Sequence, residues 1–303
     1  MSSMLKAISE RSETLRGIAK VLRKNWKIDL GLGIIIGLAV LSALSPIIDY
    51  YMFGPGVNPT AVGAFPILLP PSPKHPLGTD NWGRDILADI IQGTGISLEI
   101  GAIAGAVSIF LAILLGLTAG YLGGYLDTSL RAFTDTFLVI PSWPILAALS
   151  AVFAGKVNLV TLALILSIFT WPAAARSIRS IALSMRDRPF IELAKATNLN
   201  VFEILFMEIM PQLAPYLVIN FNYMMMGAIF AEAGLRFIGL GPPGVPSLGL
   251  IAAQTIGAGF FTLRPIVIVV EVAFFILIFM GLNFINIGIE EESNPRLKGV
   301  TGE

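Results

Sequence analysis

The chain has 303 residues, of which 55% are hydrophobic and 13% charged, and its mean hydropathy is +0.80. These values lie outside the range of soluble globular proteins and indicate an integral membrane protein. The zero formal net charge offers no bulk attraction for nucleic acid, the absence of cysteine excludes disulfides and thiolate metal sites, and a single histidine argues against a zinc site, so we expect no bound metal.

The first 27 residues form a basic segment, with seven Lys or Arg side chains against two Glu. Its leucines and isoleucines recur at about helical spacing. Two interpretations remain open: an amphipathic helix on an anionic membrane surface, or a basic cytoplasmic tail. A cleaved signal peptide fits less well, because the basic region is long.

Long apolar stretches predict six transmembrane helices, since about 20 residues cross the ~30 Å hydrocarbon core. The first covers residues 28–50, and the others lie within a core of residues 95–289, at 95–121, 130–154, 157–175, 213–240 and 265–289. Residues 51–94 are rich in Pro and Gly, and they predict an extracytoplasmic loop without regular helix.

The distribution of Lys and Arg predicts that both termini are cytoplasmic. In that orientation fifteen of the twenty basic residues lie inside: seven in the tail, one after the second span, five in a central loop, and two in the final segment, residues 290–303. We therefore expect a multi-pass protein of the cell membrane, that is, the plasma or inner membrane.

The central loop, residues 176–212, lies between apolar spans but is rich in charged residues. Asp187 and Pro189 suit the start of a short helix, and 198–200 suits a break. A second helix from Val201 is expected to stop or kink at Pro211. Because each helix has an apolar face in the cytosol, this loop predicts a protein partner.

The loop resembles the EAA loop of permease subunits in ABC importers. The resemblance rests on Glu192, Ala194, Ala196, Ile209 and Pro211. In that family the loop contains a coupling helix that docks on a cytoplasmic ATPase. It implies an ATPase-coupling role for Glu192, Ala194, Ala196, Asn198, Leu199, Val201, Phe202, Leu205, Ile209 and Pro211.

Two positions depart from the EAA pattern. Leu193 stands where the family has Ala, and Asn198 stands where it has Gly. Asn tolerates the left-handed backbone that Gly would supply, so the turn is expected to survive.

A second motif, residues 75–85, reads HPLGTDNWGRD. Pro76 and Gly78 predict a turn, and Asp80 or Asn81 is suited to cap a helix that begins near Arg84. The motif is similar to the HPLGTDxxGRD sequence of permeases in the dipeptide, oligopeptide and nickel branch of ABC importers.

Further matches to that branch follow in the same order along the chain. They are Gly120 to Gly124 with Asp127, Glu232-Ala233, Phe237 to Gly241, Pro246-Ser247 with Gly249, and Asn294-Pro295-Arg296. Together with the first motif they cover residues 75–296, and they identify the chain as a second-permease type of this branch.

The resemblance implies an all-α membrane protein with the six-helix type I permease fold, which imports short peptides by alternating access. Its implied partners are a homologous permease, two ATPase subunits and an external binding protein. ATP and Mg²⁺ are expected on the ATPases, with no cofactor in this chain. No G-x-x-x-x-G-K-[ST] motif occurs, so this subunit is not expected to be an enzyme.

Polar side chains within the predicted spans are candidates for the pathway. They are Asn220, Tyr223, Gln254, Glu271 and Asn283. Hydrogen bonding between helices is the alternative for the amides. For Glu271 the alternatives are a place on the pathway, contact with a partner helix, or interfacial snorkelling near the end of its span.

Charged residues at i, i+4 spacing predict two structural arrangements. Glu232 and Arg236 are one turn apart and predict an ion pair, with an outer gate or a substrate contact as the alternative. Asp127, Arg131 and Asp135 share one helix face and are expected to satisfy one another.

Alternatives remain open for the transported substrate and for the class of transporter. Oligosaccharides such as xylo- or cello-oligosaccharides are the alternative to peptides, and nickel fits less well. A channel or secondary transporter that works without ATP is the rival from another class; it predicts an inverted repeat, which the sequence does not show convincingly.

Overall fold

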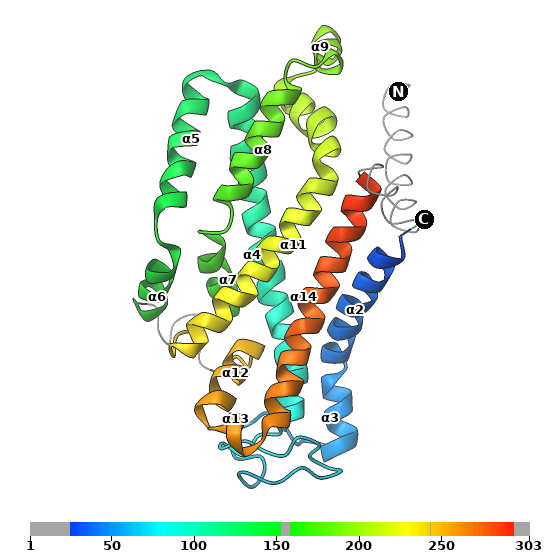
Figure 1. Cartoon of the computed structure of the whole chain (residues 1–303), viewed down its shortest axis with the longest axis vertical. Coiled ribbons are helices and arrows are strands. Elements are labelled where there is room, and N and C mark those ends of the chain that lie inside the picture. Colours follow the sequence, from blue (N-terminus) through cyan, green and yellow to red (C-terminus); the bar gives the residue numbers. More distant parts are fainter. Residues whose placement is uncertain (1–24, 153–157, 243, 294–303) are drawn as a thin grey trace. The chain divides into compact units, whose positions relative to one another are not determined.

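A computed structural model describes residues 25–152, 158–242 and 244–293. In these ranges the regular elements are helices, with one isolated β-bridge between Thr79 and Asp85 (Figure 1). The chain divides into two compact units, residues 38–275 and residues 1–37 with 276–303. The basic segment of residues 1–24 and the Asn294-Pro295-Arg296 match lie outside the described residues.

Helix α4, Ile86–Leu122, belongs to the larger unit and has 37 residues. The Asp85 side chain caps it by accepting a hydrogen bond of 2.9 Å from the Ala88 amide, and Gly123 ends it with a φ of 68°. The helix thus begins at Ile86, inside the predicted loop of residues 51–94. Asp85 is the cap rather than Asp80 or Asn81, because Asp80 instead binds Arg84 at 2.7 Å.

Two glycine pairs on α4 allow neighbouring helices to approach closely. Gly101 and Gly105 face helix α11, Met210–Phe237. A Cβ atom on Gly101 would lie 2.8 Å from the Met225 side chain, and one on Gly105 would lie 3.1 Å from Phe221. The spacing is that of the small-xxx-small pairs that pack membrane helices.

The second pair, Gly116 and Gly120, faces helix α8, Pro172–Met185. A Cβ atom on Gly116 would lie 2.7 Å from the Ala175 carbonyl oxygen, and one on Gly120 would lie 2.8 Å from Ala182 Cβ. Helix α4 (cyan) therefore lies beside α8 and α11 (Figure 1).

The predicted span of residues 130–154 consists of two helices, α5, Gly124–Val139, and α6, Ser142–Val152. They are bent by 81° at Pro141. Ile140 is extended, with a ψ of 125°, as expected for a residue before proline, and Pro141 has no amide hydrogen to continue the helix. The apolar run predicted one span here, and the structure has a bent pair of helices in its place.

The predicted span of residues 157–175 is also broken. Helix α7, Leu159–Ser167, and helix α8 are bent by 51°, and α8 begins with Pro172 in its first turn. Helix α8 then continues to Met185, well into the predicted central loop.

The remainder of that loop contains the two short helices predicted from sequence. Helix α9 is Pro189–Ala196, and after a break helix α10 is Val201–Glu203. The chain continues as a π-helical segment η1, Ile204–Ile209, directly into α11. Pro211 does not end the helix: the wider π turn just before it accommodates the missing amide hydrogen.

Two short helices precede the last long one and were not predicted. Helix α12, Leu248–Gly257, is capped by Ser247, and helix α13 is Phe260–Leu263. Ten residues of α-helix extend only about 15 Å, so α12 is too short to cross a membrane. Helix α14, Pro265–Ser293, begins where predicted.

The first predicted span, residues 28–50, also contains a break. Helix α2 is Trp26–Ala43, and helix α3, Ser45–Phe53, follows after Leu44, with Pro46 in its first turn. In the smaller unit, the start of α2 packs on the end of α14. Gly31 lies against Gly281 and Ile285, and the Asn25 amide donates to Glu291 at 3.1 Å.

By length and composition, four described helices are candidate membrane spans, α2, α4, α14 and the continuous helix of residues 201–237. The number rises to six if each bent pair, α5 with α6 and α7 with α8, counts as one span.

The glycine contacts predict that Gly116→Leu will destabilise the protein. A leucine there must displace the α8 backbone at Ala175, and overpacking of this kind costs about 1–3 kcal/mol. We expect the unfolding temperature of the protein in detergent to fall by several degrees. Gly227→Leu on α11 is the matched control, because no atom lies within 4 Å of its added Cβ. An equal decrease in both variants would contradict this packing role.

Candidate functional site

The break between α9 and α10 depends on one residue with a left-handed backbone. Asn198 has a φ of 60°, the conformation expected for an Asn in the place of a Gly. Asn200 then starts the next helix through a reciprocal capping box: its side chain accepts from the Glu203 amide at 2.9 Å, and Glu203 accepts from the Asn200 amide at 2.7 Å.

The ten residues predicted to couple the chain to an ATPase differ in how far their side chains are exposed. Ala194, Leu205 and Ile209 are buried, whereas Leu199 is half-buried. The exposed members are Glu192, Ala196, Asn198, Val201, Phe202 and Pro211.

Exposed apolar side chains gather on this segment. Leu193, Phe202 and Met207 are 66%, 68% and 63% exposed, and Val201 is also exposed. We call these four residues the docking face. Leu193 and Met207 were not among the predicted coupling residues, although their apolar character in a charged loop was a signal.

The opposite side of the segment is anchored in the hydrophobic core. Ile191 and Ile204 are buried in the same cluster as Ile178 of α8 and Leu117 of α4. The segment is therefore packed against the two helices that the Gly116 and Gly120 contacts bring together.

Ion pairs join α5 to α8 beside this core. Arg179 donates to both carboxylate oxygens of Asp127, and Arg176 lies 2.5 Å from Asp135. Arg131 reaches only Asp135, at 3.7 Å. The prediction that Asp127, Arg131 and Asp135 satisfy one another was thus wrong for Asp127, because α8 lies close enough to supply a bidentate arginine.

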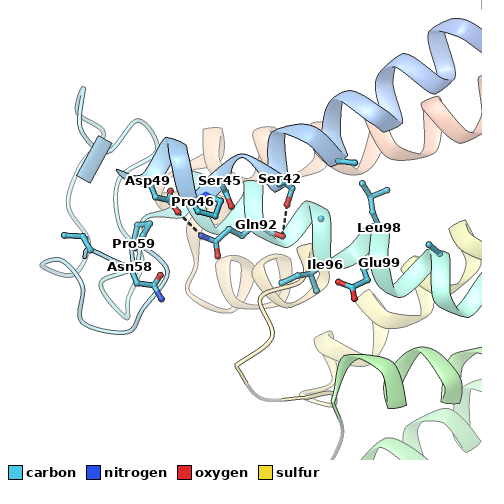
Figure 2. Close-up of a pocket in the computed structure, with 15 residues that line it drawn as sticks. Ser42, Ser45, Pro46, Asp49, Asn58, Pro59, Gln92, Ile96, Leu98 and Glu99 are labelled. Atoms are coloured by element: carbon cyan, nitrogen blue, oxygen red, sulfur yellow. Dashed lines mark hydrogen bonds between the residues drawn. The ribbon is translucent and has the colours of Figure 1, made fainter. Parts of the chain in front are cut away.

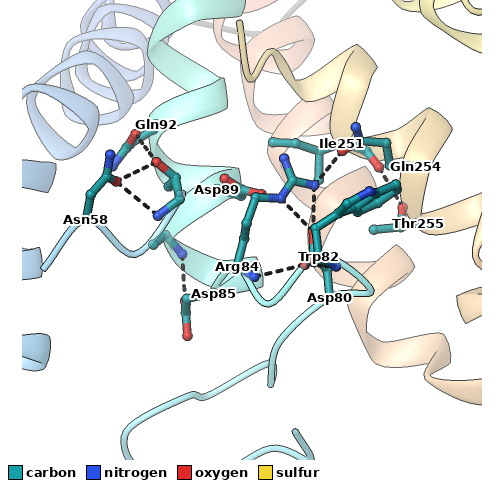
Figure 3. Close-up of polar contacts among 12 residues, drawn as sticks. Asn58, Asp80, Trp82, Arg84, Asp85, Asp89, Gln92, Ile251, Gln254 and Thr255 are labelled. Atoms are coloured by element: carbon teal, nitrogen blue, oxygen red, sulfur yellow. Dashed lines mark hydrogen bonds and ion pairs between the residues drawn. The ribbon is translucent and has the colours of Figure 1, made fainter. Parts of the chain in front are cut away.

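The HPLGTDNWGRD motif forms a buried polar cluster around Arg84 (Figure 3). Arg84 binds Asp80 at 2.7 Å, Asp89 of α4 at 3.4 Å and the Gln254 side chain of α12 at 2.6 Å. His75 binds Asp85, the cap of α4, at 2.9 Å. The motif therefore ties the loop to two helices.

Glu271 of α14 is 2% exposed and accepts a hydrogen bond of 2.9 Å from Thr255 of α12. Interfacial snorkelling is thus not what the structure shows. The other carboxylate oxygen, Oε1, is buried without a hydrogen-bond partner among the described residues.

The predicted ion pair of Glu232 and Arg236 is confirmed, with 2.7 Å between Arg236 Nε and Glu232 Oε1 and both side chains buried. Ser247, the cap of α12, also donates to Glu232 at 2.6 Å. Arg236 donates to the carbonyl oxygens of Pro242 and Val245 at 2.7 and 3.2 Å. The pair therefore holds the connection between α11 and α12.

The other pathway candidates are placed separately. The Gln254 side chain accepts a hydrogen bond from Arg84, and the Asn220 side chain donates to the Tyr216 carbonyl of its own helix at 2.8 Å. Tyr223 is about half exposed on α11, and Asn283 is exposed on the part of α14 in the smaller unit.

A groove of about 810 Å³ lies between α4 and the segment formed by the end of α2, α3 and the following loop (Figure 2). Its polar lining includes Ser42, Asp49, Asn58, Gln92 and Glu99. The Gln92 amide donates to Asp49 at 3.0 Å. Burial raises the pKa of Asp49, which lies outside the candidate spans, and the Gln92 hydrogen bond partly opposes this shift.

Sequence reasoning missed Glu99, although an isolated acidic residue in the apolar run of α4 was a signal for it. It also missed the Arg84 cluster with Gln254, because these residues are 170 positions apart.

Taken together, the apolar helices, the broken spans and the anchored polar loop define a multi-pass helical membrane protein. Residues 112–298 match the family described as "Binding-protein-dependent transport system inner membrane component". The chain belongs to this family, and it is therefore a permease, a membrane transport component without a catalytic domain.

Related proteins match over most of the chain. The oligopeptide transport system permease protein OppC of Mycobacterium tuberculosis is 32% identical over 231 residues, which are 76% of this chain and 78% of the relative. A probable peptide ABC transporter permease protein, y4tQ, of Sinorhizobium fredii is 30% identical over 282 residues, 93% of each chain. OppC of Lactococcus lactis is 29% identical over 230 residues, 76% of this chain and 78% of the relative.

The buried ion pair predicts that Arg236→Met will be strongly destabilising. The variant leaves the Glu232 carboxylate buried without its cation, which typically costs 3–5 kcal/mol. We expect a large decrease in unfolding temperature in detergent.

The double variant Glu232→Gln with Arg236→Met provides the control. Because it removes both charges, it is expected to recover a large part of the lost stability. A double variant as unstable as the sum of the two single variants would show that the two side chains do not act as a pair.

Proposed function

We propose that the chain is one of two permease subunits of an ATP-driven importer of short peptides. The observation that carries the proposal is the match over 93% of both chains to a relative named as a peptide ABC transporter permease. The OppC relatives, named for oligopeptide transport, support the same substrate class.

In this proposal six spans cross the membrane, with each bent pair counted as one span, and both termini are cytoplasmic. The distribution of Lys and Arg supports this orientation. It places the docking face in the cytosol and the Arg84 cluster outside.

The partners in this proposal are a second, homologous permease, two ATPase subunits that hold ATP and Mg²⁺, and an external binding protein. The docking face supports an ATPase contact, because Leu193, Phe202 and Met207 expose apolar surface that a partner would bury. The segment thus serves as the EAA coupling loop, with Asn198 supplying its turn.

Transport then requires two arrangements of the helices whose populations the nucleotide changes. Closure of the ATPases moves the docking face, and the buried residues Ile191, Leu205 and Ile209 transmit that movement to α4, α8 and α11. Because the Arg179–Asp127 ion pair joins α5 to α8, α5 moves together with α8. The pathway consequently alternates between outward and inward access.

The substrate class is tested by ATP hydrolysis of the reconstituted complex with its binding protein. We expect short peptides to stimulate hydrolysis and to accumulate in proteoliposomes, whereas xylo- and cello-oligosaccharides do neither. Stimulation by the oligosaccharides alone would replace the proposed substrate, and transport without ATP would contradict the transporter class.

The coupling role predicts that Phe202→Ser will weaken the stimulation of ATP hydrolysis by substrate. Loss of the exposed ring removes apolar contact with the ATPase, so we expect substrate-stimulated hydrolysis to fall about 5-fold or more, with the fold of the chain retained. Phe261→Ser on α13 is the matched control, because Phe261 is 70% exposed on a different helix. If Phe202→Ser behaves like this control, the docking face does not couple the subunits.

A further inference from the structure

Glu99 has an unusual position on α4. The helix contains two acidic side chains and no basic one: Asp89, which Arg84 contacts, and Glu99, which is exposed. Within the described chain, Glu99 has no hydrogen bond or ion pair. In Figure 2 its carboxylate extends from α4 at the groove without a dashed line to any neighbour.

A charge at this position needs water or a positive group nearby. Glu99 lies thirteen residues after Ile86, with the apolar run of α4 on both sides, and thirteen residues of helix correspond to about 20 Å. A carboxylate that faces hydrocarbon at the centre of a span is strongly unfavourable, so acidic residues in spans usually face a cavity or a partner.

The groove supplies such a cavity. One face of α4 forms a wall, since Gln92, Gly95, Ile96, Glu99 and Ala102 follow one another at helical spacing. Small residues on the other wall, Ala39, Ser42 and Ala43, leave the space open. Its volume of about 810 Å³ is in the range of sites for small organic ligands.

The charged side chains that line the groove are acidic. Asp49 and Glu99 are the charged residues among those that line the groove, and no Lys, Arg or His lines it within the described residues. Like charges in a concave site concentrate the potential and favour cations.

The two carboxylates differ in their availability. Gln92 holds Asp49 at 3.0 Å, and Thr60 in turn donates to Gln92 Oε1 at 3.3 Å. Asp49 is thus fixed in the wall, whereas Glu99 is free to contact a ligand.

We propose that Glu99 lines the substrate pathway and contacts a positively charged group, the α-ammonium, of the transported peptide. This inference rests on the proposed function, because a peptide importer handles a substrate with this cation. At the same groove Asn58 Oδ1 already accepts from Thr60, and its side-chain NH2 is the group suited to donate to a peptide carbonyl. An arginine from a second permease is the competing occupant, and the tests below distinguish the two.

The first test uses the absence of cysteine from the chain. Glu99→Cys introduces the single thiol of this subunit into the assembled complex, and a complex with the unsubstituted chain gives the background of the partner subunits. A cationic, water-soluble methanethiosulfonate is expected to modify Glu99→Cys well above background, and saturating tripeptide is expected to slow this reaction at least 5-fold. Asn58→Cys, in the exposed loop at the groove, serves as the accessible reference.

Modification no faster than background would overturn the proposal, because position 99 would then be covered by lipid or by the second permease. Modification that tripeptide does not slow would overturn the substrate contact.

The second test measures the contribution of the charge. Glu99→Gln is expected to lower tripeptide uptake by proteoliposomes about 10-fold at low peptide concentration, whereas Glu99→Asp retains most of the uptake. Glu290→Gln, at an exposed position on α14, is the control for loss of one charge. Unchanged uptake by Glu99→Gln would overturn the proposal, as would loss of assembled complex in this variant.

Failure of the proposed function has a different signature. If the wild-type complex takes up oligosaccharides and no peptide, the proposed substrate class is wrong. The proposed contact of Glu99 with a peptide ammonium is then wrong as well. If the wild type takes up peptide and the Glu99 variants match it, only the inference on Glu99 is wrong.

Discussion

The close packing of α4 against two other helices is the contact on which the larger unit depends. Gly101 and Gly105 admit α11, and Gly116 and Gly120 admit α8. In a bilayer the hydrophobic effect does not draw helices together, so van der Waals contact at short range has to do so. The glycines supply that contact, and they place α4 beside α8 and α11.

The two ends of α4 contact different kinds of side chain, polar at its start and apolar near its end. At its start, Asp85 and Asp89 belong to the polar cluster of His75 and Arg84, which extends to α12. Near its end, Leu117 lies in the core beneath the docking face. A helix of 37 residues is about 55 Å long, so one rigid element links the cluster to the docking segment.

Length and hydropathy found the apolar runs, but these two properties do not specify where a run bends. Length and hydropathy predicted single spans at residues 130–154 and 157–175, and the structure has bends of 81° and 51° there. Pro211 predicted a stop or a kink, and the helix continues there through a π-helical segment just before the proline. Proline shows where a helix is under strain, whereas the packing of its neighbours decides whether it breaks.

The sequence by itself determined the membrane class, the short helices around Asn198 and the ion pair of Glu232 with Arg236. These follow from composition, local capping and i, i+4 spacing, all of which act within a few residues. Only the tertiary structure decided that Arg179 satisfies Asp127, that Gln254 joins Arg84, and that Glu99 opens on a groove. Those contacts join residues that are far apart along the chain, and their partners are set by how the helices pack.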